Sequence, residues 1–340
     1  MKQTGFYKMV VFVALVVLVA PLAAAPAAPA GRGRRGIMGD WLVKAEFGGR
    51  PMTLILSFSR DKEGNLAGGW ISFGGLSELR DIKYEDNKLS FVQVSRFGDR
   101  EFRSDFAGSI EGGTLTGTVS SERGELQMEG TRMRRMPRVV GNWAMKVKMG
   151  EREYTGTLAI KADEKRNLTA EWQSERGEHQ ISDVQYENGQ LTFKRTSKFG
   201  DRQFESTFEG TVEEDALTGT FKSERGEAAG EGRRIGAALI GKWELDITSE
   251  RGTRKQMLQV NPDMSGWYGA MAVKKINLEG NQVTFQIVLE FGDRKFEINF
   301  KGEMDGQKLT GETTNPMGTQ TVTGKKLPPP VGRRGSRRAD

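Results

Sequence analysis

The sequence contains no cysteine and only one histidine, His179, among its 340 residues. Without cysteine the chain forms no disulfide, carries no lipid-attachment thiol and offers no thiolate to a metal. A Ser-His-Asp triad would depend on His179, which lies in the turn-like segment SERGEHQ with no Gly-x-Ser-x-Gly motif to accompany it. We therefore expect a solvated His179, no metal, no cofactor and no enzymatic activity, with polysaccharide hydrolysis by a carboxylate pair as the weakest alternative.

Long apolar runs are also scarce. The longest, MVVFVALVVLVA at 9–20, follows Lys2 and Lys8 and precedes the small-residue segment APLAAAPAAPA. This order is typical of a secretory signal, which we place in a signal and processing region at 1–30. Twelve residues are too few to cross a bilayer as a helix. We expect an exported bacterial protein, periplasmic or secreted, with no transmembrane span after cleavage.

The excess of positive charge lies at the two ends of the chain. The formal net charge is +6, but residues 1–35 carry +5 and residues 325–340 carry another +5, so residues 36–324 carry about −4. A folded part of this charge is not a basic surface for specific nucleic-acid binding. The basic linker at 31–38 and the tail at 328–340 are predicted to be disordered, and an anionic envelope polymer is the partner that such tails would bind.

Three copies of one module account for the rest of the chain. Each copy opens on Gly-x-Trp, continues through a second tryptophan and a Phe-Gly-Asp-Arg string, and closes on Leu-Thr-Gly. Copies one and two keep a constant offset of 102 residues, and the third is shorter. This register predicts repeats at 39–135, 139–236 and 239–327.

Within each module, apolar and polar residues alternate with period two. In FESTFEGTV, Phe204, Ser206, Phe208 and Val212 share one face, as expected for a half-buried strand. Turn residues divide the first module into about eight such runs, and no run with helical period follows the signal. We predict an all-β protein of three tandem antiparallel up-and-down meander barrels, because closure removes the two unpaired edges of a long meander. An open two-sheet sandwich is the alternative.

The two ends of each module resemble the calycin signature of lipocalins and avidins. Trp41, Trp143 and Trp243 lie on the first strands, and basic residues lie on the last strands, with two candidates in each module: Arg132 or Arg134, Arg233 or Arg234, and Lys325 or Lys326. In that superfamily the tryptophan packs across one barrel end beneath the basic side chain. The resemblance implies a cup for a small, often apolar ligand, and it carries over no catalytic residues.

The Phe-Gly-Asp-Arg strings are predicted to be turns. Gly followed by Asp suits a two-residue type II′ hairpin in which the glycine takes a positive φ, at Gly98, Gly200 and Gly292. The string SERG recurs between other strands of the modules, which is also typical of a turn. Because these hairpins all join odd strands to the following even strands, they should form a charged rim opposite the Gly-x-Trp end.

Small-molecule binding and a structural role remain as rival functions. If the barrels bind a small apolar or amphipathic ligand, the residues predicted to contact it are interior tryptophans, rim arginines and interior serines: Trp70, Trp172, Arg100, Arg202, Ser104 and Ser206. Trp267 is the corresponding second tryptophan of the third module, where Ile298 replaces the interior serine, so this barrel is expected to be filled and to bind less well. The rival is an envelope spacer or adhesion protein with filled barrels.

Overall fold

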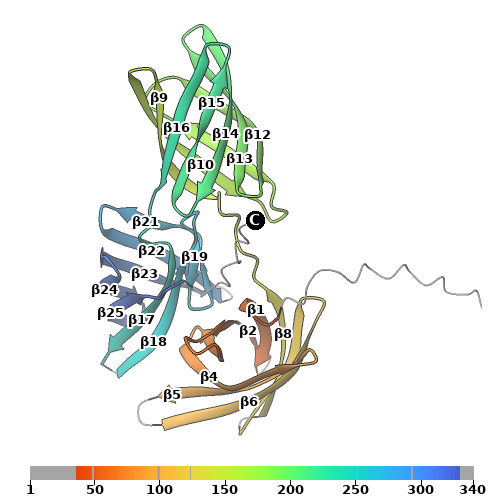
Figure 1. Ribbon diagram of the computed structural model, residues 1–340. Coiled ribbons are helices and arrows are strands. Elements are labelled where there is room, and N and C mark those ends of the chain that lie inside the picture. Colours follow the sequence, from red (N-terminus) through yellow and green to blue (C-terminus); the bar gives the residue numbers. More distant parts are fainter. Residues whose placement is uncertain are drawn as a thin grey trace, which may run out of the picture. The chain divides into compact units, whose positions relative to one another are not determined.

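The computed structural model describes residues 36–329 except 48–49, 98–99, 123, 251 and 292–293. The described residues form antiparallel strands and turns and no helix, in three sheets that follow one another along the chain (Figure 1). The predicted all-β class and the three tandem meanders are confirmed. The predicted signal, most of the basic linker, all but the first residues of the tail, Gly98 and Gly292 lie outside the described residues.

The first repeat is a closed eight-stranded barrel, in which β1 pairs with both β2 and β8. Closure decides against the open sandwich here, and it leaves no unpaired edge. The eight strands are β1 (Gly39–Phe47), β2 (Arg50–Arg60), β3 (Leu66–Ser72), β4 (Gly75–Glu85), β5 (Lys88–Phe97), β6 (Arg100–Glu111), β7 (Thr114–Ser121) and β8 (Gly124–Arg132).

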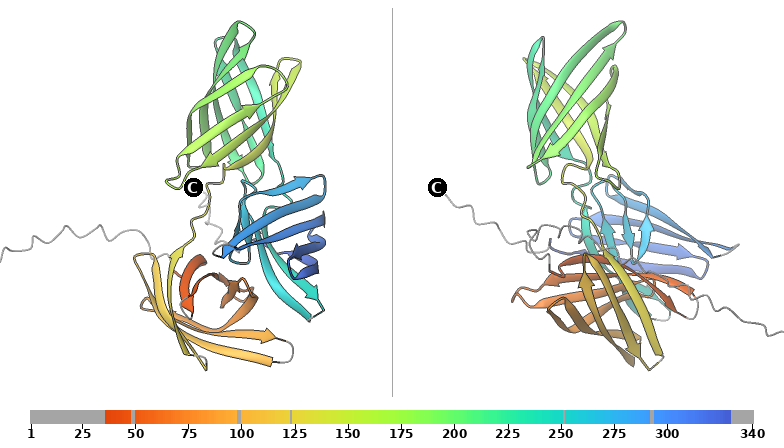
Figure 2. Two further views of the ribbon diagram at one scale, coloured as in Figure 1. Left: turned by 180° about the vertical axis from the view of Figure 1, so that it is seen from behind. Right: turned by 90° about the vertical axis from the view of Figure 1, so that its right-hand side faces the viewer.

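The second repeat repeats this meander with one difference. Its sheet runs β11-β10-β9-β16-β15-β14-β13-β12, so β11 and β12 are its two ends and are not hydrogen-bonded to each other. The strands are β9 (Gly141–Met149), β10 (Arg152–Ala162), β11 (Leu168–Gln173), β12 (Glu178–Glu187), β13 (Gln190–Phe199), β14 (Arg202–Glu213), β15 (Ala216–Ser223) and β16 (Gly226–Arg234). The two additional views in Figure 2 show the strands of this repeat wound into a nearly closed barrel.

The third repeat has nine strands, because its third and fourth strands are replaced by three short ones. Its sheet runs from β20 through β17 and β25 to β21 and is also nearly closed. The strands are β17 (Gly241–Ser249), β18 (Gly252–Val260), β19 (Gly266–Tyr268), β20 (Met271–Val273), β21 (Ile276–Glu279), β22 (Gln282–Phe291), β23 (Arg294–Asp305), β24 (Lys308–Asn315) and β25 (Gly318–Lys326).

A tryptophan beneath a cation closes one end of every barrel. The side chains of Trp41, Trp143 and Trp243 are fully buried. Each indole N–H donates to the backbone carbonyl four residues earlier, at 2.8–2.9 Å. The predicted packing of a basic residue over each ring is confirmed, and the structure selects one candidate of each pair, with distances to the ring centroid of 4.4, 4.1 and 5.8 Å for Arg132, Arg234 and Lys326 respectively.

Stacked phenylalanines fill the middle of each barrel and explain the Leu-Thr-Gly glycines. The pairs Phe91–Phe106, Phe193–Phe208 and Phe285–Phe300 have ring centroids 4.5, 4.9 and 4.8 Å apart. In the first repeat Gly108 and Gly117 face each other across β6 and β7. A Cβ at Gly117 would lie 2.5 Å from the Phe106 ring, so only glycine admits the ring there.

The hairpins behave as the turn strings predict. Gly200 has φ +59°, and Phe199 pairs with Arg202 across it, as a two-residue turn requires. In the SERG turns at 121–124, 223–226 and 249–252, the serine hydroxyl donates to the glycine carbonyl at 3.1–3.3 Å. The copy at 174–177 differs, because it joins the unpaired strands β11 and β12.

Candidate ligand-binding site

The predicted interior tryptophans are buried, but only in the first two repeats. Trp70 and Trp172 are each 6% exposed. Each lies opposite a leucine of the preceding strand, and that leucine lies opposite the end-closing tryptophan of the first strand. In the third repeat the strand register places Tyr268 at this position, and Trp267 is its outward-facing neighbour. Trp267 packs against a separate apolar cluster that contains Met257 and Ala270. The expectation that Trp267 is the counterpart of the interior tryptophans is therefore wrong.

The rim arginines among the predicted ligand-binding residues do not come together with these tryptophans. Arg100 and Arg202 begin β6 and β14 and are exposed at the hairpins. Ser104 and Ser206 are half-buried on the inward-facing side of the same strands, directly opposite Gln93 and Arg195. The serines therefore face the barrel interiors, whereas the rim arginines lie outside them.

His179 is not the solvated loop residue that the sequence predicts. It lies near the start of β12, half-buried, with Nδ1 2.9 Å from Ser197 Oγ and Nε2 2.9 Å from Ser174 Oγ. Its ring contacts the edge of Trp172 at 6.2 Å between centroids. Burial, followed by the nearby Arg195 charge, lowers the pKa of His179, and its contact with the Arg176 carbonyl opposes this shift. The repeat alignment could have shown that His179 faces a strand partner. The 102-residue offset aligns His179 with Ser77, whose hydroxyl hydrogen-bonds the Ser95 hydroxyl in the first repeat.

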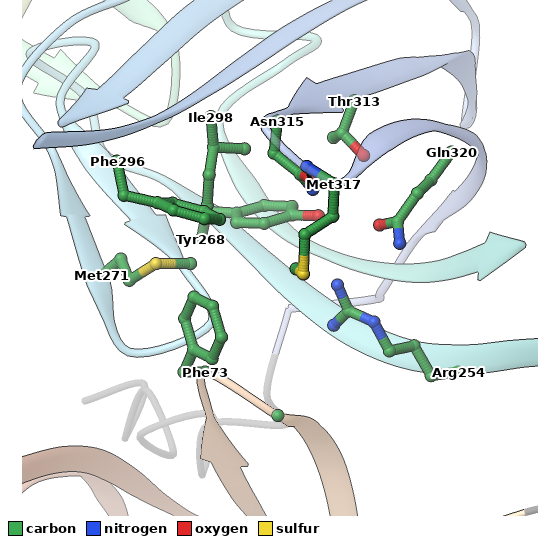
Figure 3. A pocket seen from close by; sticks show the side chains of 11 residues that line it. Phe73, Arg254, Tyr268, Met271, Phe296, Ile298, Thr313, Asn315, Met317 and Gln320 are labelled. Carbon is green, nitrogen blue, oxygen red and sulfur yellow. Dashed lines mark hydrogen bonds between the residues drawn. The ribbon is translucent and has the colours of Figure 1, made fainter. Parts of the chain in front are cut away.

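A pocket of about 160 Å³ lies in the third repeat (Figure 3). Figure 3 shows apolar side chains on one side, among them Phe296, Ile298 and Met271, and the polar ends of Arg254 and Gln320 on the other. The pocket contradicts the expectation, drawn from Ile298, that the third barrel is filled. Ligand binding by any of the three barrels remains a prediction. The pocket combines an apolar wall with a few polar groups, the usual composition of a small-molecule site.

The polar side of the pocket contains buried groups without partners. Arg254 Nη1 and Thr313 Oγ1 are excluded from solvent and have no hydrogen-bond partner of normal geometry. Both residues lie close enough to the Tyr268 hydroxyl to favour its ionised form, but burial is the larger effect and raises the pKa of Tyr268. A buried donor left unpaired costs about 1–3 kcal/mol, so an acceptor supplied by a ligand would recover free energy at this place.

The polar groups are specific to the third repeat. Arg254 lies opposite Ile247, and the same register positions hold Met52 in the first repeat and Tyr154 in the second. The cross-strand pair Thr313–Gln320 likewise replaces pairs of apolar residues, Val119–Leu126 and Phe221–Ala228. Two copies of the fold thus form without these polar side chains, which favours a role for them other than folding.

A turn of the first repeat contributes to the mouth of this pocket. Phe73 and Gly74, in the turn between β3 and β4, line the pocket. The fully buried Gln256 of β18 donates from Nε2 to the Ser72 carbonyl at 3.1 Å and to the Phe73 carbonyl at 3.4 Å. No single-module argument could have predicted this contribution, because it joins segments about 180 residues apart.

The described residues provide little else for chemistry. They contain no group of three or more His, Asp and Glu side chains placed to hold a metal ion. They also contain no helix with the length and hydropathy of a membrane span.

Comparison with known proteins does not identify a family for this chain. No protein-family model and no curated protein matches the sequence. Among solved structures, a Bacteroides fragilis protein provisionally assigned to the outer membrane aligns over 86% of this chain and 98% of its own, with 12% identity and a TM-score of 0.22. Transferrin binding protein B of Haemophilus parasuis, a double mutant, aligns over 85% and 75%, with 12% identity and a TM-score of 0.20. The same protein of Neisseria meningitidis aligns over 81% and 65%, with 14% identity and a TM-score of 0.18. At these TM-scores the likenesses do not bear on function.

Proposed function

We propose that this is an exported, non-enzymatic binding protein that holds a small amphipathic molecule in the pocket of its third barrel. The observation that carries the proposal is the unpartnered, solvent-excluded Arg254 Nη1 beside an apolar wall. Export rests on the signal-like residues 1–30, and the first two barrels serve as related modules of the same array.

The lining chemistry favours a ligand with an anionic end and a short apolar body. Arg254 is a cation with several donors, and Thr313, Asn315 and Gln320 add neutral polar groups. The pocket lining has no carboxylate or imidazole that would accept a proton from a bound molecule, which fits binding better than catalysis. Guanidinium groups pair with carboxylates through two parallel hydrogen bonds, so a medium-chain carboxylate is the ligand class that fits best.

The test is a head-group series with one tail: octanoate, octanol and octylamine, each titrated into the mature protein by calorimetry. Octanoate should bind most tightly, and Arg254→Met, which installs the first repeat's residue, should reduce its affinity at least tenfold while leaving octanol nearly unchanged. Arg100→Gln, which removes an exposed rim charge, is the matched control. Equal affinity of all three ligands, or no change on R254M, would leave the spacer role with filled barrels as the better account.

A further inference from the structure

The interior of the second barrel contains a half-buried cation that the proposed function does not use. Arg195, in the middle of β13, lies opposite Ser206 of β14. Its guanidinium carbon is 4.6 Å from the Trp172 ring centroid and 4.2 Å from that of Phe221. Arg195 Nε is excluded from solvent and has no hydrogen-bond partner.

Arg195 also lacks a counter-charge among the described residues. Burial alone lowers the pKa of Arg195 to about 10, and no carboxylate opposes the shift. The contrast within the same barrel is Arg234, which is buried beside Trp143 but donates from Nε to Asp215 Oδ1 at 2.9 Å. Withdrawing a charge from water costs free energy unless a counter-charge compensates it, so a half-buried cation without an ion pair is suited to bind an anion from outside.

The barrel itself does not require a cation at this position. The same register position, opposite the inward residue of the sixth strand, holds Gln93 in the first repeat and Ile287 in the third. Gln93 finds a neutral partner within its own barrel, because its Nε2 donates to Ser95 Oγ at 2.8 Å. Two copies of the fold therefore form with a neutral residue here.

The strands beside Arg195 differ in their pairing from the equivalent strands of the first barrel. Strands β3 and β4 of the first repeat pair through five residues on each side, from Gly68↔Leu79 to Ser72↔Gly75. Their counterparts β11 and β12 have no backbone pairing. Trp172 comes from β11 and His179 from β12, so the two strands that flank this unpaired seam supply aromatic side chains next to the cation.

We propose that the second barrel binds a small organic carboxylate at Arg195, reached through the unpaired seam between β11 and β12. The carboxylate pairs with the guanidinium, and the hydroxyls of Ser197 and Ser206 lie on the neighbouring inward positions. The body of the ligand would lie against the Trp172 and His179 rings at the seam, because Phe193, Phe208 and Phe221 are buried and packed against one another. This site is independent of the pocket that contains Arg254.

The experiment uses benzoate as the carboxylate and benzyl alcohol as its neutral analogue. Both are titrated at constant ionic strength into the mature protein in the R254M background, so that binding in the third repeat does not contribute. Benzoate should bind and benzyl alcohol should bind at least tenfold more weakly. Arg195→Gln, which installs the first repeat's residue, should weaken benzoate at least tenfold, and Arg152→Gln, which removes an exposed arginine of the same barrel, should not.

A second measurement needs no variant at Arg195. Benzoate should slow amide hydrogen exchange in the β13 segment 190–199 and leave the equivalent β5 segment 88–97 unchanged. Four results would each overturn the proposal and leave Arg195 as a structural cation. These are no binding of benzoate, equal affinity for benzyl alcohol, unchanged benzoate affinity in R195Q, and equal protection of the two segments. The failure of octanoate to respond to R254M would sink the proposed function of the third barrel without affecting this one.

Discussion

Replacing Arg234 tests whether the cation over the end-closing tryptophan stabilises its barrel. The guanidinium lies 4.1 Å from the Trp143 ring centroid, and it donates from Nη1 to the Val140 carbonyl and from Nη2 to the Arg138 carbonyl, each at 2.5 Å. Its Nε bonds Asp215, whose side chain is exposed. Arg234 therefore ties the last strand of the barrel to the segment that precedes the first.

The expected cost of Arg234→Met follows from these contacts. Loss of the cation–π contact costs about 0.5–2 kcal/mol. The two carbonyls lose charge-assisted hydrogen bonds, at about 1.5–3 kcal/mol each before relaxation and rehydration. The Asp215 pair adds about 0–1 kcal/mol, since that carboxylate is solvated. Because the carbonyls regain water in part, we expect a total of about 3–5 kcal/mol.

Arg234→Lys should cost less, about 1–2 kcal/mol, because it keeps the charge that supplies the cation–π contact. The third repeat shows how lysine performs this role: Lys326 Nζ lies 5.8 Å from the Trp243 ring centroid and bonds the Ala238 carbonyl at 2.5 Å. The comparison of methionine with lysine therefore separates loss of charge from loss of guanidinium geometry.

Hydrogen exchange followed by mass spectrometry resolves the affected barrel, which a global melt of three barrels would not. In R234M, amides of β9 and β16 should exchange about 10³-fold faster, since each 1.4 kcal/mol is a factor of ten. Amides of β17 and β25 should not change. An acceleration of less than tenfold in β9 and β16 would refute the reasoning.

Three further substitutions have defined outcomes. Gly200→Val should cost about 1–2 kcal/mol in urea unfolding, because φ is +59° there, and Gly200→Asn should cost less; equal stability of both would contradict the turn assignment. Because burial lowers the folded-state pKa of His179, its contribution is fully present above the unfolded pKa of about 6.5 and is lost as pH falls through the folded value. His179→Ser, the residue of the first repeat, should flatten the drop in urea midpoint between pH 7.5 and 5.5, and an unchanged drop would exclude His179 as its source. Thr313→Val should raise stability by about 1 kcal/mol, because it removes a buried hydroxyl without a partner, and a lower melting temperature would show that the hydroxyl is satisfied.

Much of the architecture was predictable because it depends on local pattern. Alternation with period two identifies strands within a few residues, and the regular recurrence of Gly-x-Trp identifies repeats without any knowledge of tertiary contacts. The type II′ turn at Gly200 was predictable for the same reason. The choice of Arg234 over Arg233 was not, because it depends on which face of the last strand turns inward at the barrel end.

Register is where sequence reasoning failed. Trp267 and Tyr268 are adjacent, and a shift of one residue exchanges the inside of a barrel for the outside. The irregular short strands β19, β20 and β21 remove the constant offset that aligned the first two repeats, so the sequence could not show which aromatic faces inward. The polar residues of the pocket come from β18, β19, β24 and β25, and its apolar residues include members of β20, β23 and the turn between β3 and β4, so no single segment of the sequence revealed it.

The sequence by itself determined the strand class, the threefold repetition and the turns, because each follows from residues close in the chain or from regular spacing between copies. The tryptophan–cation ends followed from the resemblance of the module ends to the calycin signature. The tertiary structure alone decided that the first barrel closes and that the second leaves β11 and β12 unpaired. It alone decided that Arg195 and Arg254 lie inside barrels with unpartnered nitrogens. The physical reason is that the burial of a side chain and the hydrogen bonds it makes depend on every strand around the barrel. The sequence of one strand does not show which groups the distant strands place beside it.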